Sequence, residues 1–272
     1  MSFVMNYQGT GQNPAESTFN TVQRPRSFQA AGIDGCKAGW LVAVVSAMKV
    51  VTGASTTCVY ALQEFWVART FNEILPKTKQ FELVCVDIPI GLSDGNKPRE
   101  CDLAARKILR GKRASSVFPA PIRQCLRVKD YETASKISFE RSGKKLSRQS
   151  FALLDKIRQV DDSMTPALQR RVREIHPEIS FWALNDKKPV PQNKKTVPGQ
   201  AHRHKMLKEI FTDMDNILME ASIYGYAMDD AFDALVAAWT AGQAVVGKAG
   251  TLPPNPELDS KGLRMEILCP VK

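Results

Sequence analysis

The sequence lacks the features that would place the chain in or across a membrane. No apolar run among its 272 residues reaches the roughly 18 to 20 that a membrane-spanning helix needs. The first residues have neither the basic start nor the apolar core of a signal peptide. These absences predict a cytoplasmic protein with no membrane partner.

Paired cysteines and grouped histidines are also missing. The six cysteines are widely spaced and form no C-x-x-C pair, which predicts reduced, mostly buried thiols. Two of the three histidines, His202 and His204, form an H-x-H in a lysine-rich segment but lack the companion ligands of a closed zinc site. For these two, phosphate contact or no role is the expectation.

Length and composition indicate one large domain. The chain is 43% hydrophobic and 24% charged, enough to bury a core. Residues 1–29 are rich in Gln, Asn, Thr, Ser and Pro, so we predict a disordered tail there. Residues 30–272 then form the domain, with a helical insertion at about 92–168.

The net charge of +10 is concentrated in one region. Lys97 to Arg173 contains 20 Lys and Arg against 8 Asp and Glu, a surplus of +12, so the rest of the chain carries −2. A local basic surplus suits an anionic partner such as nucleic acid. The alternative is a set of solvated helices with cationic outer faces.

The first third of the domain predicts an α/β sheet. AGIDG and WLVAVVSAM are apolar strands joined by a short turn, TTCVYAL follows as a third, and LVCVDI is a strand buried on both faces. A short helix lies before this last strand, in ARTFNEILPKT. The order is therefore β-β-β-α-β.

The remaining chain predicts helices, a loop and two late strands. Helices are expected within the insertion, at about 203–219 and at about 229–246. Residues 187–204, rich in Pro, Lys and Gln, predict a mobile loop. Residues 171–175 form a strand, and GLRMEILCPV forms a last one at an edge.

Carboxylates at unusual positions predict a metal site. Asp34 interrupts an apolar run, Asp87 ends a buried strand, and Asp233 is flanked by apolar residues in a helix. Such acids would meet at one end of the sheet, where a divalent cation would neutralise their repulsion. Hard oxygen ligands favour Mg²⁺ or Mn²⁺ over zinc.

Other residues around this site have two interpretations each. Asp230, three positions before Asp233, is either a metal ligand on the same helix face or a partner of the helix dipole. Glu178 is either a further ligand or a salt-bridge partner of the basic insertion. Lys156, Arg106 and Arg203 are candidates for phosphate contact, or simply exposed helix cations.

Six blocks in order resemble the DUF429 family, predicted nucleases of the ribonuclease-H-like superfamily. They are GIDGCKAGW, VDIPIGL, the R-x-C-D-x-x-A-R that starts at Arg99, SSVFPAP, HPEISF and DDAFDALVAAW, within about residues 31–246. The resemblance implies a mixed five-stranded sheet in the order 3-2-1-4-5. It also implies catalytic acids on the first strand, the fourth strand and the last helix, which Asp34, Asp87 and Asp233 match.

The function expected from these observations is metal-dependent hydrolysis of phosphodiester bonds in nucleic acid. Asp34, Asp87 and Asp233 would be catalytic, and Asp230 and Glu178 would add metal ligands. One alternative is a nucleotide-binding phosphotransferase of the actin and sugar-kinase type, although the sequence has no second glycine-rich phosphate loop. The other is a non-catalytic nucleic-acid-binding protein with the same fold.

Overall fold

A five-stranded mixed sheet forms the centre of the computed structural model, which describes residues 26–52, 55–95, 97–221 and 225–271. The strand order is β3-β2-β1-β4-β5, as expected. β1, β2 and β3 pair antiparallel, whereas β4 and β5 run parallel to β1. The strands are Arg26–Cys36, Gly39–Thr52, Ser55–Ala68, Leu83–Val86 and Val172–Glu174.

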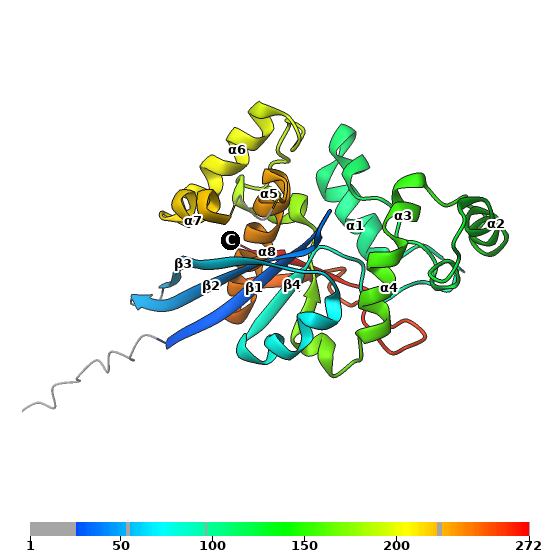
Figure 1. Ribbon diagram of the computed structural model, residues 1–272, viewed down its shortest axis with the longest axis horizontal. Coiled ribbons are helices and arrows are strands. Elements are labelled where there is room, and N and C mark those ends of the chain that lie inside the picture. Colours follow the sequence, from blue (N-terminus) through cyan, green and yellow to red (C-terminus); the bar gives the residue numbers. More distant parts are fainter. Residues whose placement is uncertain (1–25, 53–54, 96, 222–224, 272) are drawn as a thin grey trace, which may run out of the picture.

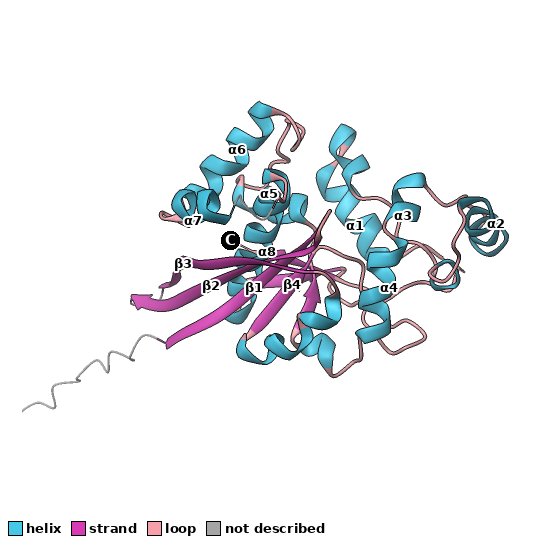
Figure 2. Ribbon diagram, viewed as in Figure 1, coloured by secondary structure: helices cyan, strands magenta, loops and turns pink. Residues whose placement is uncertain are grey.

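Helices lie on both faces of the sheet (Figures 1 and 2). α5, α6, α7 and α8 share one hydrophobic cluster with the strands, and α4 shares the other together with the 3-10 helices η1 and η2. The helices after the sheet are α5 (Pro177–Leu184), α6 (Val197–Lys208), α7 (Met214–Ala221) and α8 (Met228–Val245). The two 3-10 helices are Phe71–Glu73 and Leu75–Gln80.

Alternation along the strands divides side chains between these two clusters. In β2, Leu41, Ala43 and Val45 face the α8 side, whereas Trp40 and Val42 face the α4 side. A strand whose residues are apolar on both faces must be covered on both faces. The near-continuous apolar runs in the sequence therefore account for the central position of β1, β2 and β4.

The insertion is helical, as predicted, and is green in Figure 1. Asp130 caps the start of α2 by accepting a hydrogen bond from the Thr133 N–H at 2.8 Å, and Gly143 ends that helix. The helices are α1 (Glu100–Leu109), α2 (Tyr131–Ser142), α3 (Arg148–Ala152) and α4 (Leu154–Ser163), with the 3-10 helices η3 (Gly111–Ser116), η4 (Arg123–Cys125) and η5 (Leu168–Arg170).

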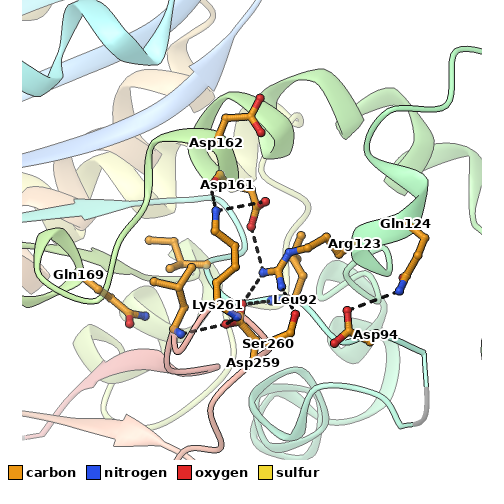
Figure 3. Close-up of polar contacts among 12 residues, drawn as sticks. Leu92, Asp94, Arg123, Gln124, Asp161, Asp162, Gln169, Asp259, Ser260 and Lys261 are labelled. Carbon is orange, nitrogen blue, oxygen red and sulfur yellow. Dashed lines mark hydrogen bonds and ion pairs between the residues drawn. The ribbon is translucent and has the colours of Figure 1, made fainter.

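One arginine ties the insertion to the C-terminal segment (Figure 3). Arg123 forms ion pairs with Asp161 of α4 and with Asp259, whose side chain is fully buried. Asp259 also accepts a hydrogen bond from the Leu92 N–H at 3.0 Å, just after the exit from β4. Ser260 accepts a further bond from Arg123 at 2.7 Å. The contacts of Asp259 and Ser260 hold together segments more than 100 residues apart in the chain.

Four boundaries differ from the expectation. β1 begins at Arg26, so the predicted tail is too long at its end, and residues 1–25 of it lie outside the described residues. α6 occupies the second half of the predicted loop 187–204, because Thr196 caps a helix that has Pro198 in its first turn. The helix expected at 203–219 is two helices, α6 and α7.

The fourth difference concerns the last strand, β7 (Ile267–Pro270). It pairs with β6 (Ala249–Leu252) in a separate two-stranded sheet and is linked to the end of β5 by a bridge between Ile175 and Leu268. The sequence analysis missed β6. Within the described ranges, no helix has the length and apolar character to cross a membrane.

α8 packs directly on β1 through Gly32. A Cβ atom at this position would lie 2.0 Å from the Ala234 carbonyl oxygen and 2.2 Å from the Ala238 amide nitrogen. Both are backbone atoms, so no rotamer change can relieve the clash. Glycine is therefore required for this contact between helix and strand.

We expect Gly32→Ala to lower the free energy of unfolding by at least about 3 kcal/mol, the upper part of the range for overpacking. The matched control is Gly250→Ala in β6, where the one contact of an added Cβ is Val271 at 4.0 Å. Urea unfolding of both variants measures the effect. Equal, small losses of stability would contradict the close packing at Gly32.

Candidate metal centre

The carboxyl ends of β1 and β4 place Asp34 and Asp87 side by side. The two strands are parallel, with Ile33 opposite Val86, and the Asp87 N–H donates to the Ile33 carbonyl at 2.9 Å. Asp34 is 6% exposed, and Asp87 is partly buried directly after β4. This edge is the one at which open α/β sheets present ligands.

α8 brings two further carboxylates to the same edge. Asp233 is fully buried, one residue before the Ala234 carbonyl that packs on Gly32. Asp230 is half-buried, and its carboxylate accepts a hydrogen bond from the Ala227 N–H at 3.3 Å. Asp230 therefore has a structural task at the start of the helix that Asp233 does not share.

β5 leads into His176 and Glu178 beside these acids. The Nδ1 atom of His176 accepts a hydrogen bond from the Glu178 N–H at 3.2 Å, so Nε2 carries the ring proton and donates to the Ser116 carbonyl at 3.3 Å. Burial lowers the pKa of His176, in keeping with a neutral ring. His176 therefore caps the start of α5 and also links it by a hydrogen bond to Ser116 of the insertion.

Glu178 is held by two arginines. Its Oε1 atom pairs with Arg113 of the insertion at 2.6 Å and with the fully buried Arg203 at 2.5 Å. The salt bridge to the insertion, one of the two roles considered for Glu178, is thus present. Its Oε2 atom is buried without a hydrogen-bond partner in the described structure.

One cleft of about 480 Å³ brings these acids, His176 and Arg113 together, and we call it the carboxylate cleft. It contains the five acids that the sequence singled out. Lysines and an arginine also line it. Its charged and titratable lining residues are Asp34, Asp87, Arg113, Lys156, His176, Glu178, Lys194, Lys195, Asp230 and Asp233.

Lys194 is the site residue that sequence analysis missed. Its ammonium forms an ion pair and a hydrogen bond with the Oδ2 atom of Asp233. It lies in the segment before α6, which has no periodicity to predict where its side chains point. One signal could have drawn attention to Lys194. Thr196 followed by Pro198 is typical of a helix start, and an ordered helix start would hold Lys194 and Lys195 in fixed positions.

Burial among like charges raises the pKa of the four aspartates. Burial is the largest cause for Asp34, followed by the charges of Asp233 and Asp87. It raises the pKa of Asp87 to about 6 and that of Asp233 to about 7, although the Lys194 ammonium acts in the opposite direction. The pKa of Lys194 is raised by the same acids, despite its burial. The cluster is thus short of positive charge.

The donor set fits a hard divalent cation. Asp34, Asp87 and Asp233 offer carboxylate oxygens, the ligands that Mg²⁺ and Mn²⁺ prefer. The Oδ1 atom of Asp233 is buried and, like Glu178 Oε2, has no hydrogen-bond partner within the described residues. A buried oxygen without a partner is costly unless something binds it.

A second, tighter group of ligands lies where α1 of the insertion meets the end of β5. Atoms of Cys101, Asp102 and Glu174 all lie within 4.8 Å of one another, close enough to hold a metal ion. Arg99 lies among them, 2.6 Å from Glu174 and 2.9 Å from the Cys101 sulfur. The guanidinium therefore already supplies the positive charge that this group needs.

The candidates for phosphate contact have different environments. Lys156 lines the carboxylate cleft, where its amine donates to the Gly39 carbonyl. Arg203 is buried against Glu178 and is absent from the cleft lining, so both interpretations of it, phosphate contact and an exposed helix cation, were wrong. The histidines bind neighbours instead: His202 contacts Gln192 at 3.1 Å and His204 contacts Asp215 at 2.6 Å.

Comparison with known proteins gives a family but no activity. The model of the family described as "Protein of unknown function (DUF429)" matches residues 32–258, which is most of the chain. The protein therefore belongs to the DUF429 family. No curated protein and no solved structure matches it.

We expect Asp87→Asn to gain stability over the parent protein as the pH rises from about 4 to about 6. The folded parent holds the Asp87 proton up to a pKa of about 6, whereas the unfolded chain releases it near 3.8. Ionising this raised-pKa acid therefore costs folding free energy, absent below pH 4 and complete above pH 6. The gain should reach on the order of 2–3 kcal/mol.

Urea unfolding in the presence of a chelator, at a series of pH values, measures this difference. Asp213→Asn, at an exposed carboxylate, controls for the loss of one negative charge. A pH-independent difference between Asp87→Asn and the parent would show that Asp87 is not in a crowded acidic cluster.

Proposed function

We propose that this protein is a metal-dependent phosphodiester hydrolase that acts on nucleic acid, with the arrangement of a ribonuclease-H-like enzyme. One observation carries the proposal: acids from the ends of two parallel strands and from α8 line a single cleft. The sheet order β3-β2-β1-β4-β5 supports it, because this order is the one that the family resemblance implied. Clustered carboxylates are the ligands of two-metal phosphodiester chemistry.

Asp34, Asp87 and Asp233 would hold Mg²⁺ or Mn²⁺, with Asp230 and the free oxygen of Glu178 as further ligands. The chemistry that such cations supply when bound is activation of water and neutralisation of the charge that develops on the phosphodiester. The close contact of α8 with β1 at Gly32 sets the position of Asp233 relative to Asp34. Arg113 and Arg203 fix the orientation of Glu178.

Positive charge near the carboxylate cleft supports an anionic polymer as substrate. Lys156 and Lys195 line the cleft itself. Arg110 and Lys112 are exposed at the start of η3, the short helix that carries Arg113 and Ser116 into the cleft. Neither of these two exposed cations forms an ion pair within the described residues. Unpaired cations beside a catalytic site attract a phosphate backbone.

We expect Asp233→Asn to lower metal-dependent cleavage of nucleic acid by at least about 100-fold, the effect of removing one preorganised electrostatic group. Asp230→Asn should be milder and partly rescued by Mn²⁺, because Asp230 also serves the start of α8. The measurement is cleavage of labelled single-stranded and branched DNA and RNA by both variants over a range of Mn²⁺ concentrations.

Asp229→Asn, the neighbouring position in the first turn, is the matched control. It lies outside the carboxylate cleft lining and should retain parental cleavage. Greater damage from Asp230→Asn than from Asp233→Asn would reverse the assignment of the α8 ligand. Failure of the parent protein to cleave any substrate with any divalent cation would favour a non-catalytic binding protein.

A further inference from the structure

A second cavity lies in the helical insertion, between α1, α2 and α3, and we call it the insertion pocket. Its volume is about 320 Å³, at the small end of the range for small-molecule sites. Its lining residues fall within 93–95, 97–106, 119–122 and 138–150, so it is built almost wholly from the segment with the basic surplus. In the described part of the chain, it shares no lining residue with the carboxylate cleft.

The insertion pocket and the carboxylate cleft are nevertheless neighbours. Ser116 and Phe118 line the cleft, whereas Pro119 and Ala120, the next residues in the chain, line the pocket. α3 is divided in the same way, with Gln149 at the cleft and Ser150 at the pocket. The two cavities therefore lie on either side of the same two segments, the stretch that follows η3 and the start of α3.

The rim of the insertion pocket is positively charged. Arg106, Lys144 and Lys145 line it, and none of them forms an ion pair within the described ranges. Asp102 is the acid in the lining, and it is already engaged by Arg99 at 3.8 Å and by the Ala120 N–H at 3.2 Å. Arg106 donates a hydrogen bond to the Val117 carbonyl at 2.5 Å, so the pocket presents to an anion three cations that no acid neutralises within the described ranges.

The turn that carries the two lysines is held in place. Gly143 adopts a left-handed conformation with φ of +70° and ends α2. The Ser138 hydroxyl then donates to the Lys144 carbonyl at 2.8 Å. Ordering this turn before a ligand arrives lowers the entropic cost of binding.

Apolar side chains form a second part of the lining, beside several serines. Ile122 and Leu146 are buried, whereas Leu103 of α1 is 49% exposed. Exposed apolar surface inside a pocket favours the uncharged part of a ligand. Free cations beside an apolar wall suit a molecule with an anionic group and an uncharged ring.

We propose that the insertion pocket binds one nucleoside phosphate, with the phosphate at Arg106, Lys144 and Lys145 and the base against Leu103, Ile122 and Leu146. Its size accepts a single unpaired nucleotide and excludes a base pair. The nucleotide comes either from the free pool or from a strand whose phosphodiester lies in the carboxylate cleft. The second source rests on the proposed function, whereas binding of the nucleotide itself does not.

The test is calorimetric binding of adenosine 5′-monophosphate and, separately, of a short single-stranded oligonucleotide, both with a chelator present. The double variant K144Q/K145Q should weaken binding at least about tenfold, because it removes two charge-assisted contacts. Leu103→Asp, at an exposed position that tolerates a polar side chain, should weaken binding by a similar factor through repulsion of the ligand. K107Q/K136Q removes the same charge from α1 and α2 at exposed positions outside the pocket and should change affinity less than about twofold.

The two ligands distinguish the two sources. Sensitivity of mononucleotide binding to the pocket variants supports a site for a free nucleotide, and sensitivity of the oligonucleotide alone supports a subsite for a strand. Equal affinities of the pocket variants and the control double variant for both ligands would overturn the proposal. Asp34→Asn removes a carboxylate of the cleft and should retain mononucleotide binding. If the protein cleaves no nucleic acid, the proposed function fails, but the nucleotide site in the insertion pocket does not.

Discussion

The contact between the backbone of α8 and Gly32 of β1 is the constraint on which the rest of the site depends. Because the Ala234 carbonyl lies against Gly32, Asp233 must lie beside Asp34, two residues further along the strand. The parallel pairing of β1 with β4 then adds Asp87. A single close approach of helix to strand therefore gathers carboxylates that are about 200 residues apart in the chain. Burial makes this gathering unfavourable, as the raised pKa values of all three acids indicate.

Lys194, in the segment before α6, offsets part of the free-energy cost of burying these carboxylates together. Its ammonium pairs with one oxygen of Asp233 and leaves the other buried without a hydrogen-bond partner among the described residues. A protein selected only for stability would replace such a cluster with apolar residues, which are often at least as stable as a buried ion pair. The group formed by Cys101, Asp102 and Glu174 differs in its charge balance, because the guanidinium of Arg99 contacts both Glu174 and Cys101. The carboxylate cleft lacks this balance, which is the property expected of a site that receives a cation.

Much of the fold could be predicted from sequence because strand signals are local. Apolar runs and the turn near Gly39 located β1, β2 and β4, and the parallel ends of β1 and β4 then located Asp34 and Asp87. Lys194 and Arg203 were not predictable in the same way. Both lie in a segment without periodicity, where only the tertiary packing of α6 decides whether a cation is exposed or buried. β6 was missed because its four residues carry no strand pattern without β7 beside them.

Binding of Mn²⁺ to the metal-free protein, followed by electron paramagnetic resonance, tests the central claim most directly. The account predicts saturable binding by the parent protein and its loss in Asp34→Asn. It also predicts tighter binding by Lys194→Met, because the ammonium no longer competes for Asp233, whereas Lys195→Met at the exposed neighbouring position should match the parent. Equal Mn²⁺ affinities in the parent, Asp34→Asn and Lys194→Met would contradict a cation site at these carboxylates.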